Sequence, residues 1–264
     1  MQWQNKAFEL NRYHHMNIEK EYEFGTIRIV DEEIKEGPIR TLYVNDGKES
    51  SCFTDEGRHF DLRYAYNYEF VQMLFRTVSD RRVLLIGGAG FSLPKCFISA
   101  FPTGRMDVVE LHPEMYDIAM EYFFLDELYD KYHPDRTGRL NVIFDDGSDH
   151  IEKLSRSLKG SGADETMDKK YDLLLDDAFL GMISDEKMLS EHTVSCICDI
   201  LKPDGIFAAN IISPTEGYGS MKLTLAKSTF ENHFREVRLW QVDPDRDPKD
   251  NQNCILYAKN PLID

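Results

Sequence analysis

The stretch Val83-Leu84-Leu85-Ile86-Gly87-Gly88-Ala89-Gly90 decides the fold that the sequence predicts. Its four apolar residues are typical of a strand that is buried on both faces of a parallel sheet. The glycines follow the strand directly and precede a helix that we expect to begin near Ser92, and glycines at such a turn let a ligand approach the backbone closely. Their spacing differs from that of the common phosphate-binding loops, so we do not expect a phosphate-binding loop here.

Strands and helices alternate on the C-terminal side of this stretch, which predicts a doubly wound α/β sheet. The sequence predicts further strands at 106–110, 140–144, 171–176, 206–212, 235–241 and 253–259, and helices at 113–124, 186–201 and 218–232. A polar, Gly/Ser-rich segment at 159–170 is expected to be a surface loop.

The chain before residue 61 has a different pattern. Residues 1–21 are polar and irregular, and β-forming residues then cluster at 22–30, 39–45 and 49–54. Asn45-Asp46-Gly47 between two of these clusters is a hairpin signal. We therefore expect an N-terminal arm and small β unit at 1–60 and a Rossmann-like catalytic domain at 61–264.

Composition narrows the range of partners. The 264 residues include 31 Lys and Arg against 47 Asp and Glu, which gives a formal net charge of −16. Such a chain suits neither the phosphate backbone of nucleic acids nor an anionic membrane surface. No signal-peptide pattern and no membrane-spanning run are visible, and the five scattered cysteines are expected to be reduced thiols in a cytoplasmic protein. The histidines show no metal-ligand spacing, so we expect no metal.

Acidic residues stand at the ends of three predicted strands. Glu110 follows the glycine turn by about 20 residues, the distance at which an acidic side chain binds ribose hydroxyls in dinucleotide-binding folds. Asp146 and Asp177 follow the next two strands. Because ligands bind at the carboxyl ends of strands in open α/β sheets, these carboxylates predict a nucleoside-type site. The alternative is that they are solvated strand ends or helix caps.

The chain from residue 22 to residue 212 resembles the spermidine synthase family, the polyamine aminopropyltransferases, and is most similar to its bacterial spermidine synthase-like branch. The resemblance rests on the N-terminal strands, the glycine turn, Val108-Val109-Glu110-Leu111-His112-Pro113-Glu114, Asp145-Asp146-Gly147, Tyr171-Asp172-Leu173-Leu174-Leu175-Asp176-Asp177 and Leu201-Lys202-Pro203-Asp204-Gly205. It implies the Rossmann-like fold of S-adenosylmethionine-dependent methyltransferases, with an antiparallel last strand.

The resemblance also implies roles for single residues. Glu110 would hold the ribose of S-adenosylmethionine or its decarboxylated form, Asp146 would bind the adenine amino group, and Asp177 would orient and deprotonate the attacking amine. The other residues assigned to the cofactor are Gly87, Gly88, Gly90, Leu111, Gly147 and Asp176, and those assigned to the substrate are Tyr66 and Tyr68. The expected partner is a small-molecule amine, and a homodimer is expected.

Three positions depart from the family pattern. Gly90 stands where the family usually has an Asp near the aminopropyl tail, and Leu180 stands where it has a second Asp after the catalytic one. The Tyr-His-Glu of the family is replaced by Tyr66-Asn67-Tyr68-Glu69. The loss of an anion at Gly90 suggests the hypothesis that the site accepts ordinary, carboxylated S-adenosylmethionine.

Three functions therefore remain open from the sequence. The first is an aminopropyl or related alkyl transfer from decarboxylated S-adenosylmethionine or S-adenosylmethionine to an amine. The second is methyl transfer from S-adenosylmethionine to a small molecule, which Gly90 and Leu180 favour. The third is a non-catalytic nucleoside-binding homologue. Asp177 favours the first, because an amine nucleophile must lose a proton during the transfer.

Overall fold

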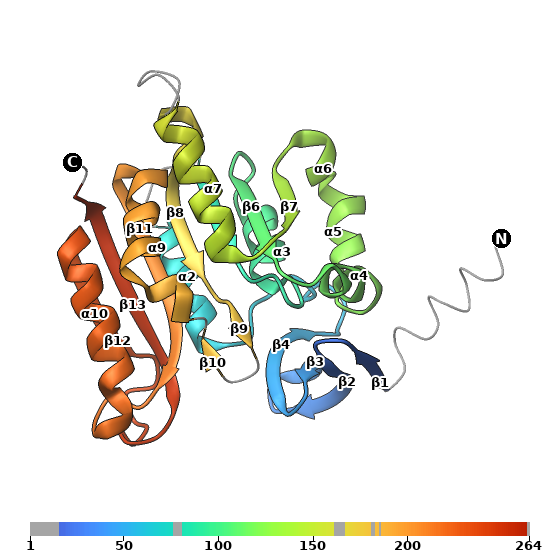
Figure 1. The fold of residues 1–264 in the computed structure, drawn as a ribbon. Coiled ribbons are helices and arrows are strands. Elements are labelled where there is room, and N and C mark those ends of the chain that lie inside the picture. Colours follow the sequence, from blue (N-terminus) through green and yellow to red (C-terminus); the bar gives the residue numbers. More distant parts are fainter. Residues whose placement is uncertain (1–15, 76–80, 161–166, 181–182, 185, 263–264) are drawn as a thin grey trace.

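A seven-stranded sheet forms the centre of the molecule (Figure 1). The computed structural model describes residues 16–75, 81–160, 167–180, 183–184 and 186–262. The strand order is β12-β13-β11-β8-β5-β6-β7. These strands are β5 (Arg82–Ile86), β6 (Arg105–Glu110), β7 (Leu140–Phe144), β8 (Tyr171–Asp176), β11 (Leu201–Ser213), β12 (Phe234–Gln241) and β13 (Gln252–Pro261). Strand β13 is antiparallel to both of its neighbours, whereas β7, β6, β5, β8 and β11 are mutually parallel. The predicted fold class is confirmed.

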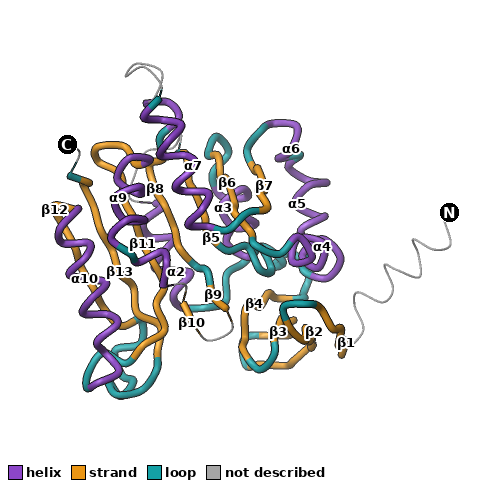
Figure 2. Tube along the Cα trace, viewed as in Figure 1, coloured by secondary structure: helices purple, strands orange, loops and turns teal. Residues whose placement is uncertain are grey.

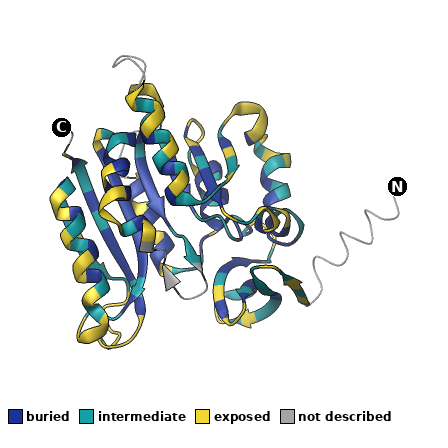
Figure 3. Ribbon diagram, viewed as in Figure 1, coloured by how far each residue is buried: buried dark blue, intermediate teal, exposed yellow. Residues whose placement is uncertain are grey.

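The sheet is covered by helices on both faces because its strands are apolar on both sides. Val83 and Leu85 of β5 belong to one hydrophobic cluster, and Leu84 and Ile86 belong to the other. Figure 1 shows α7, α9 and α10 in front of the sheet and α2 and α3 behind it. The helices are α2 (Ala65–Phe75), α3 (Ser92–Ala100), α4 (Pro113–Tyr122), α5 (Leu125–Tyr132), α6 (Pro134–Thr137), α7 (Gly147–Lys159), α9 (Glu191–Ile200) and α10 (Met221–His233). Figure 3 shows the buried strands between helices whose outer faces are exposed.

A four-stranded antiparallel sheet precedes the central sheet and is separate from it (Figure 2). It consists of β1 (Asn17–Tyr22), β2 (Gly25–Ile34), β3 (Gly37–Val44) and β4 (Gly47–Phe53). Its apolar face, which includes Ile27, Ile29 and Leu42, packs on α4 and the residues after it. The guanidinium of buried Arg40 in β3 holds this contact: it pairs with both carboxylate oxygens of Asp31 and donates to the carbonyl of Tyr122.

Several predicted elements have different bounds in the structure. Residues 17–21, predicted to be irregular, form β1 together with Tyr22, and residues 1–15 of the N-terminal arm lie outside the described residues. The helix predicted at 113–124 ends at Tyr122, because Phe124 adopts a left-handed conformation with φ of 59° before α5 begins. Helix α7, which we did not predict, occupies much of the segment between β7 and the Gly/Ser-rich segment, where residues 161–166 lie outside the description.

The remaining elements are short. They are the 3-10 helices η1 (Met167–Lys169), η2 (Glu186–Leu189) and η3 (Tyr218–Ser220), and the two-stranded pair β9 (Phe179–Leu180) and β10 (Ile183–Ser184). The predicted helix at 186–201 is thus divided into η2 and α9, with the Ser190 hydroxyl capping the start of α9. Among the described helices, none combines the length and apolar character that a membrane span needs.

Candidate functional site

The topology brings the carboxyl ends of β5 and β8 to the centre of the site. After β5 the chain proceeds to β6 and β7 on one side, and then returns to place β8 on the other side of β5. Such a reversal of strand order opens a crevice in which α/β proteins bind their ligands. A cavity of about 340 Å³ lies here, and both the central sheet and the N-terminal sheet contribute residues to its lining.

The glycine turn forms the floor of this crevice. Gly87 has φ of +90°, and a Cβ atom added to it would lie 2.6 Å from the carbonyl oxygen of Asp177. Glycine is therefore required both for the conformation and for the close approach of the two strand ends. A Cβ on Gly88 would likewise lie 2.7 Å from the ring of Phe91. The predicted glycine turn thus lies where a ligand can contact the backbone.

Glu110 lies at the end of β6 with its carboxylate turned to the glycine turn. One oxygen, Oε2, accepts hydrogen bonds from the backbone N–H groups of Gly88 and Ala89 at 2.9 and 3.1 Å. The other oxygen, Oε1, accepts one hydrogen bond from the N–H of His112 at 3.0 Å. Because a carboxylate oxygen can accept two hydrogen bonds, Oε1 can also accept one from a hydroxyl group. Glu110 therefore both fixes the turn and offers an acceptor to a ribose.

Asp146 caps the first turn of α7 at the opposite end of the cavity. Its Oδ1 accepts from the Ser148 hydroxyl at 2.6 Å and from the N–H of Asp149 at 3.1 Å, and Lys187 lies 3.6 Å from Oδ2. Burial acts to raise the pKa of Asp146, but these hydrogen bonds and the charge of Lys187 outweigh it and lower the pKa. The carboxylate is therefore ionised at neutral pH and can accept from an amino group.

Gly147 and Leu111 border the same end. A Cβ atom on Gly147 would lie 2.4 Å from Cγ2 of Ile86, so glycine allows the start of α7 to approach β5. Leu111 follows β6 and presents a side chain that is 46% exposed to the lining of the cavity. The two residues thus offer an apolar, close-fitting wall beside the Asp146 carboxylate.

Asp177 lies after β8 at the inner end of the cavity. Its Oδ2 accepts from the Tyr66 hydroxyl at 3.1 Å, and its Oδ1 accepts from Nδ2 of Asn210 at 3.2 Å. Burial raises the pKa of Asp177 to about 7, against the opposite effect of the two hydrogen bonds. An oriented carboxyl group whose pKa lies near neutrality is suited to accept and release a proton.

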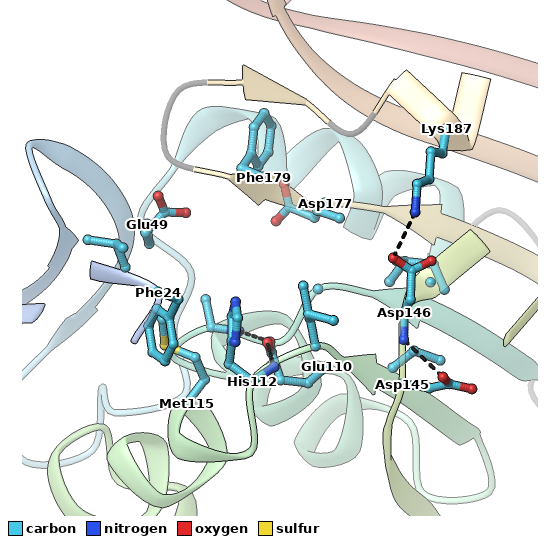
Figure 4. A pocket seen from close by; sticks show the side chains of 18 of the residues that line it. Phe24, Glu49, Glu110, His112, Met115, Asp145, Asp146, Asp177, Phe179 and Lys187 are labelled. Carbon is cyan, nitrogen blue, oxygen red and sulfur yellow. Dashed lines mark hydrogen bonds and ion pairs between the residues drawn. The ribbon is translucent and has the colours of Figure 1, made fainter. Parts of the chain in front are cut away.

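Glu49 is a site residue that the sequence did not reveal. It belongs to β4 in the N-terminal sheet, and its carboxylate points into the cavity from the wall opposite Asp177 (Figure 4). Burial, followed by the negative charges of Asp177 and Glu110, raises the pKa of Glu49 to about 8. No motif marks this residue, because it becomes part of the site only when one sheet packs beside the other.

Five predicted site residues lie outside the lining of this cavity: Gly88 and Tyr66, which border a smaller recess at its inner end, and Tyr68, Gly90 and Asp176. Tyr68 is half exposed, donates its hydroxyl to the carbonyl of Leu62, and borders a second cavity between α2 and α3. Gly90 is buried, and a Cβ atom on it would lie 2.6 Å from the Ser50 hydroxyl of β4. Asp176 is buried at the end of β8 and accepts from the N–H of Ala178. Tyr66 is the only one of the two predicted substrate tyrosines that reaches Asp177.

Replacing Glu110 with alanine is expected to weaken the binding of an adenine nucleoside by about ten- to hundredfold, the value of a lost hydrogen bond to a charged group. The substitution also leaves the N–H groups of Gly88 and Ala89 without their acceptor, which loosens the turn. Calorimetric titration with methylthioadenosine measures the effect. Equal affinities of the variant and the parent protein would exclude Glu110 from the nucleoside site.

Comparison with known proteins shows distant similarity to two kinds of transferase. No protein-family model matches the chain. The chain is 28% identical over 177 residues to the polyamine aminopropyltransferase of Vibrio vulnificus, a match that covers 67% of this chain and 50% of that protein. It is also 29% identical over 187 residues to the eEF1A lysine and N-terminal methyltransferase homologue of Drosophila melanogaster, covering 69% of this chain and 24% of that protein. The chain thus spans half or less of the length of these relatives.

The fold resembles that of a solved spermidine synthase. The spermidine synthase of Thermotoga maritima superposes with a TM-score of 0.61 at 16% identity, and the match covers 94% of this chain and 73% of that one. This likeness establishes a shared fold that includes the small N-terminal sheet as well as the central one. Together with the distant sequence similarity, it shows that this chain is similar in sequence and in fold to the spermidine synthase, or polyamine aminopropyltransferase, family.

Proposed function

We propose that this protein transfers an aminopropyl or related alkyl group from the sulfonium of decarboxylated S-adenosylmethionine or S-adenosylmethionine to a small amine acceptor. The observation that carries the proposal is the environment of Asp177. Two hydrogen bonds orient this carboxyl group at the inner end of a cavity whose other end holds Glu110 and Asp146. A proton acceptor at one end of a nucleoside site is the arrangement that amine alkylation requires.

The residues of the site divide the binding task between them. Glu110 Oε1 accepts from a ribose hydroxyl, and Asp146 Oδ2 accepts from the adenine amino group. The backbone at Gly87 and Gly88 then passes beside the chain that leads to the sulfur, since no side chain there occupies the space. The lining of the cavity is mostly apolar between its charged ends, which excludes water from the reacting atoms.

The transfer itself is a displacement at carbon. The amine nitrogen attacks the carbon bonded to sulfur, the carbon–sulfur bond breaks, and its electron pair leaves with sulfur as a neutral thioether. The amine proton passes to a carboxylate oxygen of Asp177, which Tyr66 and Asn210 hold in place. Because burial raises the pKa of Asp177 toward that of an ammonium group, the proton transfer becomes less unfavourable than it is to an ordinary carboxylate.

The pH dependence of the reaction follows from the raised pKa of Asp177. The carboxyl group accepts a proton only when it is ionised, and its pKa of about 7 places that ionisation near neutrality. We therefore expect kcat/KM to fall about tenfold per pH unit below pH 7. Initial rates from pH 5 to pH 9 measure this limb. A rate that is constant down to pH 5, where an ordinary carboxylate is still ionised, would contradict the role of Asp177.

The proposed function is tested by incubating the purified protein with either sulfonium donor and a set of diamines and monoamines. Mass spectrometry of the mixture is expected to show an alkylated amine and the thioether product in equal amounts. Neither product above the protein-free control, with every donor and acceptor pair, would overturn the proposed transfer and leave a nucleoside-binding homologue without catalysis.

Methyl transfer from S-adenosylmethionine is the second candidate. The similarity to the Drosophila melanogaster methyltransferase homologue favours it, because that match covers more than two thirds of this chain. The same experiment separates the two reactions. A methylated acceptor with S-adenosylhomocysteine identifies methyl transfer, whereas an aminopropylated acceptor with methylthioadenosine identifies the first proposal.

A further inference from the structure

The inner end of the cavity is rich in hydrogen-bond acceptors that have no donor. Oε1 of Glu49 is shielded from solvent and has no hydrogen-bond partner among the described residues. Oδ1 of Asn67 is also buried without a hydrogen-bond partner among the described residues, and this residue is only 4% exposed. Both residues line a small inner recess together with Asp177. A buried acceptor without a donor costs free energy, so this recess is suited to a ligand group that brings several donors.

The described titratable side chains of this recess include two carboxylic acids and no base. Glu49 from β4 and Asp177 from β8 face it, whereas the described residues that line it include no Lys, Arg or His. Lys187, a described lysine of the main cavity, lies at the opposite end beside Asp146 (Figure 4). A primary ammonium group has three donors and a positive charge, and it satisfies both properties of the recess. A carboxylate brings no donor to the recess and would oppose the ionisation of both acids.

We propose that Glu49 is a specificity-determining residue that binds the terminal ammonium group of the sulfonium donor, and that it selects a donor whose tail carries no carboxylate. The inference rests on the proposed function, because it assigns the tail of the same donor. It replaces the hypothesis drawn from Gly90. A Cβ atom at position 90 would lie 2.6 Å from the Ser50 hydroxyl and would not face open space. The acidic groups at the tail end of the cavity are therefore Glu49 and Asp177.

The protonation of the pair supports this assignment. Burial raises the pKa of Glu49 to about 8 and that of Asp177 to about 7, and the charges of Asp177 and Glu110 add to the effect on Glu49. Tyr66 from α2 also faces the pair, and burial followed by the charge of Asp177 raises the pKa of its hydroxyl, which keeps it protonated. At neutral pH the pair therefore holds protons that an arriving cation displaces.

Calorimetric titration of the full chain with three nucleosides tests the proposal. The probes are decarboxylated S-adenosylmethionine, S-adenosylmethionine, and methylthioadenosine, which has no ammonium group. The parent protein is expected to prefer the decarboxylated donor over the carboxylated one. In Glu49→Gln this preference is expected to fall by about tenfold or more, the value of one charge-assisted hydrogen bond, while the affinity for methylthioadenosine is unchanged. Glu33→Gln, an exposed carboxylate change in β2 of the same sheet, is the matched control.

The outcomes separate the inference from the proposed function. If no nucleoside binds to the parent protein, the proposed function itself fails. If the nucleosides bind but Glu49→Gln retains the parent preference, or if the parent protein prefers the carboxylated donor, only the role of Glu49 is overturned. If Glu49→Gln misfolds and loses methylthioadenosine binding, a measurement on the parent protein replaces it. At pH 7 the decarboxylated donor is expected to release protons from the parent protein on binding, and methylthioadenosine is not. Equal proton release would overturn the proposal.

Discussion

Asp177→Asn is expected to reduce the rate of alkyl transfer by about 10²- to 10⁴-fold, the usual contribution of a positioned general base. Asparagine has nearly the same shape and can still accept a hydrogen bond from Tyr66, but it cannot take the proton of the amine. Its Nδ2 can donate to Oδ1 of Asn210, which has no partner among the described residues. Binding of methylthioadenosine should therefore survive, and single-turnover rates together with calorimetry distinguish lost chemistry from lost binding.

The same substitution is expected to raise the thermal stability of the protein, although it lowers the activity. The pKa of Asp177 in the folded chain, about 7, lies above the ordinary value that it has when unfolded. Ionising it in the folded protein is therefore unfavourable, and the parent chain loses stability as the pH rises through 7. The Tm of Asp177→Asn should exceed that of the parent by more at pH 9 than at pH 5. A difference in Tm that does not change with pH would show that Asp177 is ionised throughout.

Asp31→Ala is expected to lower the free energy of unfolding by about 3–5 kcal/mol, since it leaves the buried guanidinium of Arg40 without its counter-charge. The pair is bidentate, with N–O distances of 2.7 and 2.9 Å, and the side chain of Arg40 is completely buried. Because Arg40 also donates to the carbonyl of Tyr122 at the end of α4, its displacement loosens the contact between the N-terminal sheet and α4. Urea denaturation followed by circular dichroism measures the change.

An exposed ion pair supplies the control for this prediction. Glu152 and Arg156 pair across one turn of α7 with both side chains accessible to solvent. Glu152→Ala should therefore lower the free energy of unfolding far less than Asp31→Ala does. If Asp31→Ala costs no more than this control, Arg40 finds another partner and the pair does not anchor the sheet.

The sequence predicted the part of the candidate site that lies at the carboxyl ends of the parallel strands. Gly87, Glu110 and Asp177 end three adjacent parallel strands, so their place along the chain was enough to bring them to one edge. Strand β1 was missed because its charged residues alternate with half-buried ones and resemble a loop. Glu49 was missed for a different reason: only tertiary packing of one sheet against the other turns it toward Asp177.

The two sheets contribute different parts of the proposed site: one holds the nucleoside, and the other sets which donor is preferred. In the proposed assignment the nucleoside is held by residues that follow residue 82, whereas Glu49, which would bind the donor's ammonium group, comes from β4 in the N-terminal sheet. On this assignment, a change of a single residue in β4 would alter which donor is accepted and leave the residues that hold the nucleoside in place.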